Sequence, residues 1–141
     1  VYRVAHSQVM SPFWSRYALA DARPLDLEHM RSCASLFPGE HDWTAFSAAQ
    51  SDAGSRVRTI SSLEIDDGWD GRGRCHLIRM TVTADGFLRY MVRSIAGTLL
   101  AAGRGEIDKA TIARAIREGG RELVGPTAPA HGLTLKCVKY D

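Results

Sequence analysis

Two stretches of the chain alternate between apolar and polar residues, which is typical of β-strands. In the first, Arg56 to Asp66, we expect one face to carry Val57, Thr59, Ser61, Leu63 and Ile65, and the other Arg56, Arg58 and Ile60. The second, Cys75 to Ala84, places Ile78, Met80 and Val82 on its buried side. Glycine and aspartate are frequent between them, from Asp66 to Gly73, which predicts the turn of an antiparallel hairpin.

Apolar residues at helical spacing predict three helices. The strongest pattern runs from Phe87 to Ala102, with two apolar rows and an opposite ridge of Arg89, Arg93 and Gly97. A second helix follows Asp26, a typical N-cap residue, and ends at Pro38-Gly39. A third follows Asp108 and ends at Gly119-Gly120.

The remaining segments complete an α+β arrangement. We expect short extended segments at 1–9 and 17–20, a compact segment at 40–50, a proline-rich loop at 125–132 and a final strand at 133–140. The order predicts an antiparallel sheet with helices packed on one face. No internal boundary divides residues 1–141, so we expect a single domain.

Composition narrows the class of protein. Of 141 residues, 45% are apolar and 24% charged, as in a globular protein with a core, and no apolar run is long enough to cross a bilayer. Three widely separated cysteines argue against a disulfide framework and for a reducing, cytoplasmic compartment. The histidines lack metal-ligand spacing, so no metal site is expected. A net charge of +2 is only a weak sign of a polyanionic partner.

Arg93 stands out because the packing pattern of its helix does not require it. A guanidinium one turn before Gly97 can lie under a closely approaching partner, and it then needs a carboxylate or phosphate for its donors. The same spacing also fits a solvated helix face. Spacing alone leaves both interpretations open.

The motif around Arg93, Gly86-Phe87-Leu88-x-x-Met91-Val92-Arg93-x-Ile95-x-Gly97, resembles the third conserved motif of the TruA family of tRNA pseudouridine synthases. Further segments resemble that family in the same order along the chain: Ser11-Pro12-Phe13, Pro24-Leu25-Asp26, the run from Gly39 to Phe46, Arg56 to Ile60, and Thr127-Ala128-Pro129-Ala130-x-Gly132-Leu133. Together they span nearly the whole chain and are far more specific than any one of them.

The resemblance implies an enzyme that isomerises uridine to pseudouridine in the anticodon stem-loop of tRNA, as a homodimer and without a cofactor. Position by position, Arg93 matches the arginine that pairs with the catalytic aspartate, and Tyr2 matches a tyrosine that lies against the target base. Val4 stands where the family has a second tyrosine. Phe87 is a second candidate for the base pocket, although a core role fits its spacing.

Arg56, Arg58 and Arg89 are candidates for contacts with RNA phosphates, because Arg56 and Arg58 share one face of a predicted strand. A solvated strand edge is the alternative. For His41 and Asp42 we favour a structural role in a turn, and for Trp43 core packing.

The family's nucleophile is an aspartate in a Gly-Arg-Thr-Asp motif of the N-terminal half, which is absent from this chain. Ser51-Asp52-Ala53-Gly54 repeats only part of that motif, so Asp52 is not expected to replace it. We therefore expect the chain to be the C-terminal half of the enzyme, inactive alone. The alternatives are a non-catalytic RNA-binding domain and a dimerisation module.

Overall fold

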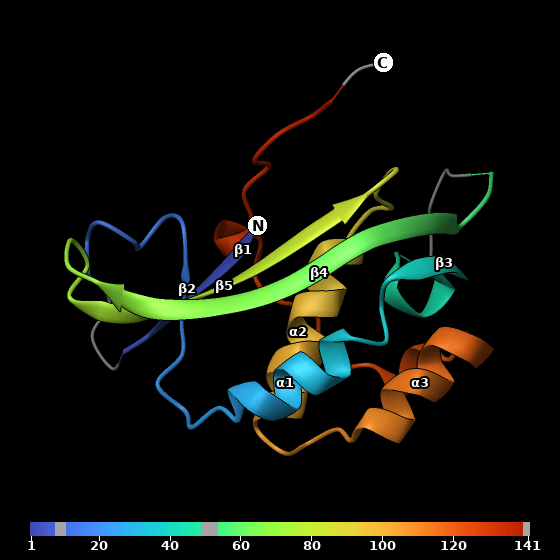
Figure 1. The fold of residues 1–141 in the computed structure, drawn as a ribbon, viewed down its shortest axis with the longest axis horizontal. Helices are drawn as coiled ribbons and strands as arrows, with labels where there is room; N and C mark the ends of the chain where they lie inside the picture. Colours follow the sequence, from blue (N-terminus) through green and yellow to red (C-terminus); the bar gives the residue numbers. More distant parts are fainter. Residues whose placement is uncertain (8–10, 49–53, 140–141) are drawn as a thin grey trace.

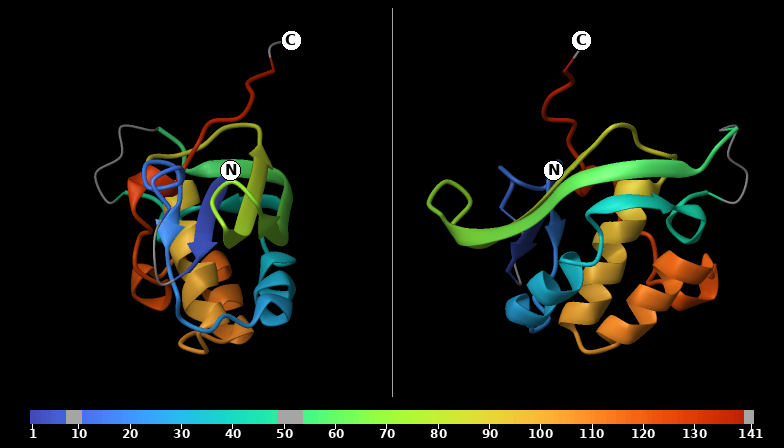
Figure 2. Two further views of the ribbon diagram at one scale, coloured as in Figure 1. Left: turned by 90° about the vertical axis from the view of Figure 1, so that its left-hand side faces the viewer. Right: turned by 45° about the vertical axis from the view of Figure 1, so that its right-hand side comes forward.

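A computed structural model describes residues 1–7, 11–48 and 54–139 of the chain. Five strands form one sheet in the order β2-β1-β5-β4-β3, and three helices cover one face of it (Figures 1 and 2). The strands are β1 (Tyr2–His6), β2 (Leu19–Ala20), β3 (Gly39–Asp42), β4 (Val57–Asp70) and β5 (Cys75–Ala84). All pairs are antiparallel except β1 with β2, so the α+β prediction is confirmed and the sheet is mixed.

The β4–β5 hairpin is longer than the sequence predicted. Its strands stay paired as far as Asp70 and Cys75, so only residues 71–74 form the turn. Acidic residues that we assigned to the turn instead pair across the strands, as in the 2.7 Å ion pair between Asp66 and Arg79. Such cross-strand pairs of opposite charge extend a hairpin that local turn propensity would end sooner.

A bulge corrects the predicted faces of β4. Ile60 pairs with Ala84 and Ser62 with Thr83, so Ser61 is an extra residue in the ladder. One extra residue reverses the alternation, and Ile60 therefore joins Leu63 in the core instead of facing away from it.

The helices are α1 (Leu27–Ala34), α2 (Met91–Gly103) and α3 (Lys109–Glu118). The predicted caps of α1 and α3 are confirmed: Asp26 accepts from the amide of His29 at 3.0 Å, and Asp108 from that of Thr111 at 2.7 Å. The predicted start of α2 at Phe87 is wrong. Tyr90, which precedes Met91, has a left-handed φ of 66°, so helical geometry cannot continue back through it.

The predicted final strand at 133–140 is also wrong over its described residues. Only Leu133 forms a bridge, to Tyr2, and Leu135 and Val138 are exposed. From Val4 onward β1 is already paired with β2, as well as with β5 on its other side. The C-terminal segment therefore finds a free backbone edge only beside the first two residues of the chain.

The core lies between the sheet and the helices. Its largest fully buried side chains include Trp43, Tyr2, Phe37 and Phe46, which confirms the core role predicted for Trp43. A smaller cluster on the opposite face of the sheet contains Ala5, Trp14, Ala18, Cys75 and Leu77. Within the described residues no helix is long and apolar enough to cross a membrane.

Candidate active site

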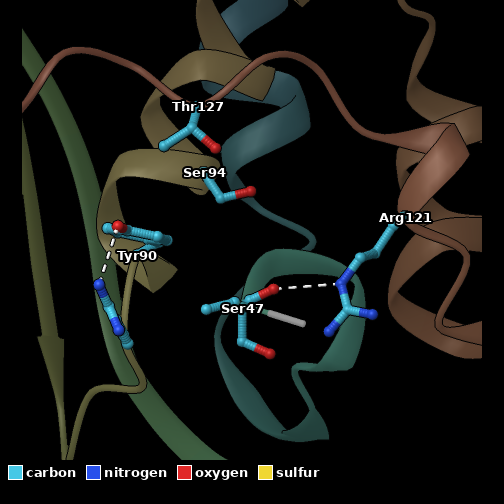
Figure 3. A pocket seen from close by; sticks show the side chains of 7 residues that line it. Ser47, Tyr90, Ser94, Arg121 and Thr127 are labelled. Atoms are coloured by element: carbon cyan, nitrogen blue, oxygen red, sulfur yellow. Dashed lines mark hydrogen bonds between the residues drawn. The ribbon is translucent and has the colours of Figure 1, made fainter. Parts of the chain in front are cut away.

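A pocket opens beside the first turn of α2, where three separate parts of the chain meet (Figure 3). Its volume is about 370 Å³, and its lining comprises Ser47, Ala48, Arg89, Tyr90, Ser94, Arg121 and Thr127. These described residues bring guanidinium and hydroxyl groups to the pocket and no carboxylate. Among the described residues no group of three or more His, Cys, Asp or Glu side chains could hold a metal ion.

Arg93 lies one turn into α2, half-buried, with its side chain in contact with the closing loop. Its Nε donates to the carbonyl oxygen of Ala128 at 2.8 Å, and its own carbonyl accepts from the amide of Ala128 at 3.0 Å. Its guanidinium carbon lies 4.8 Å from the ring centroid of Tyr90. Within the described parts of the chain, no carboxylate forms an ion pair with Arg93.

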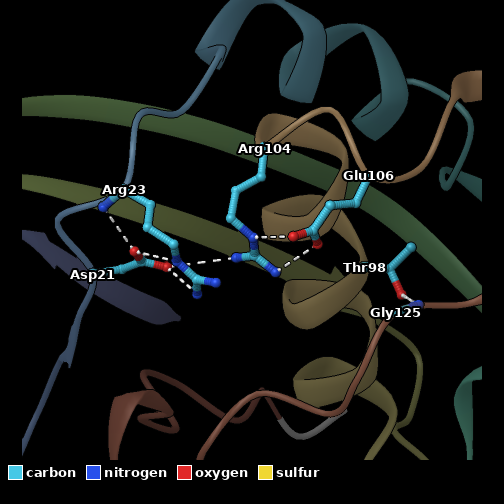
Figure 4. Close-up of polar contacts among 6 residues, drawn as sticks. All are labelled: Asp21, Arg23, Thr98, Arg104, Glu106 and Gly125. Atoms are coloured by element: carbon cyan, nitrogen blue, oxygen red, sulfur yellow. Dashed lines mark hydrogen bonds and ion pairs between the residues drawn. The ribbon is translucent and has the colours of Figure 1, made fainter.

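The position of Gly97 explains how the loop comes so close. A Cβ atom on Gly97 would lie 1.8 Å from the carbonyl oxygen of Pro126, well inside any real contact. The structure shows that this chain's own loop approaches α2 closely beside Arg93. The loop is held further by Thr98, whose Oγ1 accepts from the amide of Gly125 at 3.1 Å (Figure 4).

Tyr2 extends from β1 into the same region and is fully buried. Its hydroxyl donates to the carbonyl oxygen of Pro129 at 2.8 Å, and a Cβ on Gly132 would lie 2.6 Å from its ring. Burial raises the pKa of Tyr2 to about 12, although the nearby charge of Arg93 acts in the opposite direction. Because the ring is fully buried, we expect replacement of Tyr2 by a smaller side chain to destabilise the fold.

The three arginines expected at RNA lie in different surroundings. Arg56 precedes β4, and its Nη1 donates to Oγ of the pocket residue Ser47 at 3.4 Å, although Arg56 itself is not part of the lining. Arg89 lines the pocket and donates to the Tyr90 hydroxyl at 3.2 Å. Arg58 instead turns its Nη1 back to the carbonyls of Ser55 and Val57, at 2.9 and 2.7 Å.

Phe87 does not line this pocket. It lies before α2 with 44% of its surface exposed, so it is neither a helix residue nor a core residue here. Asp52 lies outside the described residues. Asp42 has the structural role favoured for it, since its Oδ1 accepts from the amide of Thr44 at 2.9 Å.

Sequence reasoning missed two pocket residues, Tyr90 and Arg121. Tyr90 combines a left-handed backbone with an exposed ring that two guanidiniums contact. Arg121 belongs to the short helical turn after α3, and its Nε donates to the Ser47 carbonyl at 3.2 Å. No local pattern marks either residue, because Arg121 and Ser47 are 74 positions apart.

A second polar cluster anchors the far end of α2 (Figure 4). Arg104 binds Glu106 at 3.1 Å and Asp21 at 3.5 Å, and Asp21 also accepts from Arg23 at 2.9 Å. Burial works to raise the pKa of Asp21, but the hydrogen bonds from Arg23 and the charges of Arg23 and Arg104 outweigh it and lower the pKa. This cluster therefore holds the C-terminal end of α2, whereas the pocket lies at its N-terminal end.

Comparisons with known proteins agree on one family. The model of the family described as tRNA pseudouridine synthase matches residues 33–141. Proteins named tRNA pseudouridine synthase A from Bacillus licheniformis and Bacillus subtilis are 37% and 40% identical over 141 residues, covering 100% of this chain and 53% of each relative. One from Chloroflexus aurantiacus is 41% identical over 120 residues, covering 84% of this chain and 42% of the relative. The chain thus spans about half the length of the curated relatives it matches.

Proposed function

The chain belongs to the TruA family of tRNA pseudouridine synthases, and we propose from this that it supplies one half of an active site for that reaction. The proposed substrate is a uridine in the anticodon stem-loop of tRNA, which is isomerised to pseudouridine. The chain is the C-terminal half in this proposal, and the other half carries the nucleophilic aspartate. The whole enzyme acts in the cytoplasm as a homodimer and uses no cofactor.

The observation that carries the proposal is the setting of Arg93. Its Nε is fixed by Ala128, while no carboxylate pairs with the rest of its guanidinium in the described parts of the chain. A cation that is already oriented suits an aspartate supplied by another domain. Arginine stabilises the ionised form of a nearby carboxyl, and a carboxylate must be ionised to act as a nucleophile.

In the proposed reaction the aspartate carboxylate attacks C1′ of the flipped-out uridine, and the bond between C1′ and N1 of the base breaks. The detached base rotates, and its C5 bonds to C1′ as the carboxylate leaves. C5 then loses its proton and N1 takes one up, which gives pseudouridine and regenerates the aspartate. Arg93 holds the aspartate, while Tyr2 and Phe87 contact the base. The charge of Arg93 reaches Tyr2, but the Tyr2 ring is fully buried and its hydroxyl donates to Pro129. In this proposal the residues that cover the ring must therefore move before it can contact the base.

Arg56, Arg58 and Arg89 contact RNA phosphates in this proposal. Arg56 and Arg89 support it best, because both lie around the Ser47–Ala48 segment at the pocket. Replacing Arg56 and Arg58 together by alanine should make the slope of log affinity against log salt shallower. The expected change is about 0.7–0.9 for each phosphate contact that is lost. If affinity and slope stay as in the parent, neither residue belongs to the RNA surface.

The test of function uses a protein in which this chain is joined to the half that carries Gly-Arg-Thr-Asp. Turnover is measured as tritium release from tRNA labelled at C5 of uridine. We expect Arg93→Ala to reduce turnover at saturating tRNA by at least about a hundredfold, because a buried pair broken from one side costs roughly 3–5 kcal/mol. The affinity for tRNA should fall only modestly.

Arg117→Ala is the matched control, since Arg117 is an exposed arginine on α3 with 67% of its side chain accessible. It should turn over tRNA like the parent. Near-normal turnover by a folded Arg93→Ala variant would contradict the site assignment. If the joined protein binds tRNA but makes no pseudouridine, the chain is a non-catalytic RNA-binding domain.

A further inference from the structure

Among the described residues, the pocket beside α2 gathers positive charge and has no carboxylate in its lining. Arg89 and Arg121 reach it from separate segments of the sequence, and neither forms an ion pair with a carboxylate of the described residues. Exposed arginines elsewhere, such as Arg31, Arg79 and Arg114, do have such partners. Uncompensated guanidiniums that converge on one pocket favour an anionic ligand.

The hydrogen-bond donors left in the pocket suit a phosphate group. Arg121 uses its Nε on the Ser47 carbonyl, which holds the side chain in place and leaves both terminal nitrogens for a ligand. Arg89 gives one nitrogen to the Tyr90 hydroxyl and keeps its others. The hydroxyls of Ser94 and Thr127 line the same space, and Figure 3 shows Tyr90 and Arg121 on opposite sides of it.

Tyr90 favours a phosphate over a stacked base. Its ring is the one aromatic surface among the described residues of the lining, and the guanidiniums of Arg89 and Arg93 already contact it at 4.9 and 4.8 Å. Its left-handed φ of 66° is costly for a bulky residue, and such strain is found preferentially at functional sites. The ring thereby holds two cations close together, an arrangement that an anion between them would stabilise.

We propose that this pocket is a phosphate subsite for the RNA backbone, with Arg121 and Arg89 as its binding residues. The assignment rests on the proposed function for its choice of RNA as the ligand. A volume of about 370 Å³ is at the small end of ligand pockets, so it admits a phosphate with its ribose but not a helical stem. Because Tyr90 also contacts Arg93, the subsite lies next to the proposed catalytic arginine.

The test measures binding of an anticodon stem-loop RNA to the 141-residue chain. The RNA is prepared as a series in which each member has one backbone linkage replaced by a neutral methylphosphonate. One linkage should weaken binding to the parent about tenfold when neutralised, the usual scale of a charge-assisted hydrogen bond. Arg121→Gln should bind the unmodified RNA about tenfold more weakly than the parent and be insensitive to neutralisation of that same linkage.

Arg89→Gln provides a second route, because Arg121→Gln could also loosen the Ser47 segment that Arg121 holds. It should show the same insensitivity. Arg117→Gln removes one charge from nearby α3 without touching the pocket, and it should respond to every linkage as the parent does. Melting temperatures of all variants establish that they are folded.

If folded Arg121→Gln and Arg89→Gln remain as sensitive to each linkage as the parent, the subsite proposal is wrong. The turnover assay of the joined protein separates this result from a failure of the proposed function. If the joined protein forms pseudouridine normally but the two variants keep the linkage sensitivity of the parent, only the subsite proposal is wrong. If Arg121→Gln and Arg89→Gln lose their sensitivity to one linkage but the joined protein shows no turnover, the subsite proposal is supported and the catalytic proposal is wrong.

Discussion

The close approach of the closing loop to α2 predicts a large effect for a small substitution, Gly97→Ala. The added Cβ would lie 1.8 Å from the Pro126 carbonyl oxygen, 3.0 Å from its carbon and 3.1 Å from the Ala128 nitrogen. All three are backbone atoms, so no side-chain rotation relieves the overlap. Since real contacts of a Cβ are essentially never shorter than 3.0 Å, the loop must move by more than an ångström.

That movement breaks contacts that hold Arg93. The two hydrogen bonds between Arg93 and Ala128 and the one between Gly125 and Thr98 depend on the present separation. Each contributes about 0.5–1.5 kcal/mol, whereas the better helix propensity of alanine returns only about 1 kcal/mol. We therefore expect the free energy of unfolding to fall by about 2 kcal/mol, the middle of a range of about 0.5–3.5 kcal/mol.

The assay is thermal and urea denaturation of the chain followed by circular dichroism. A fall of this size should lower Tm by about 6–10 °C for a domain of this length. Gly103→Ala is the matched control, because Gly103 is also a buried glycine of α2 but its Cβ would meet the flexible side chain of Met30, with Sδ at 2.5 Å. The Met30 side chain is fully buried, but it can adjust where backbone atoms cannot, so the control should be destabilised by about 1 kcal/mol, the low end of the cost of overpacking.

The refuting result is a Gly97→Ala variant at least as stable as the Gly103→Ala control. It would mean that the loop does not rest on α2 at this point. In the joined enzyme, the same substitution should also lower turnover, because the carbonyl of Ala128 that orients Arg93 moves away.

Further outcomes follow from the same structure. The chain alone should release no tritium from labelled tRNA, and turnover that Asp52→Ala abolishes would contradict this. In an ultraviolet pH titration, Tyr2 should ionise at about pH 12, a step that Tyr2→Phe removes and Arg93→Ala shifts upward. Because this folded-state pKa lies above the ordinary value near 10, the contribution of Tyr2 to stability is complete below pH 10 and is lost as the pH rises through 12. The pKa of Asp21 is lowered, so its contribution is present above about pH 4 and is lost on further acidification. Asp21→Asn should cost about 3 kcal/mol at neutral pH and show a shallower loss of stability in acid, and an unchanged acid profile would contradict the ion cluster.

Helix ends that depend on residues close in the sequence were predicted correctly from cap residues. Asp26 and Asp108 cap their helices through amides three positions away, and Gly119 ends α3 with a left-handed φ of 77°. The predicted start of α2 was wrong because it depends on contacts with residues outside the segment. Nothing within that segment signals the left-handed Tyr90, whose ring lies against guanidiniums and the pocket.

The fold class, the hairpin and the helix caps could be predicted from the sequence, and its motifs predicted the family and led to the proposal for Arg93. The tertiary structure alone decided what surrounds Arg93, because the contacts join residues far apart: 35 positions for Arg93 with Ala128, 74 for Arg121 with Ser47 and 127 for Tyr2 with Pro129. It also decided that the C-terminal segment is no strand over its described residues, since β2 already occupies the edge of β1 from Val4 onward. Periodicity records which face of an element is apolar, but competition for an edge and the approach of a loop to a glycine arise only once the chain has folded.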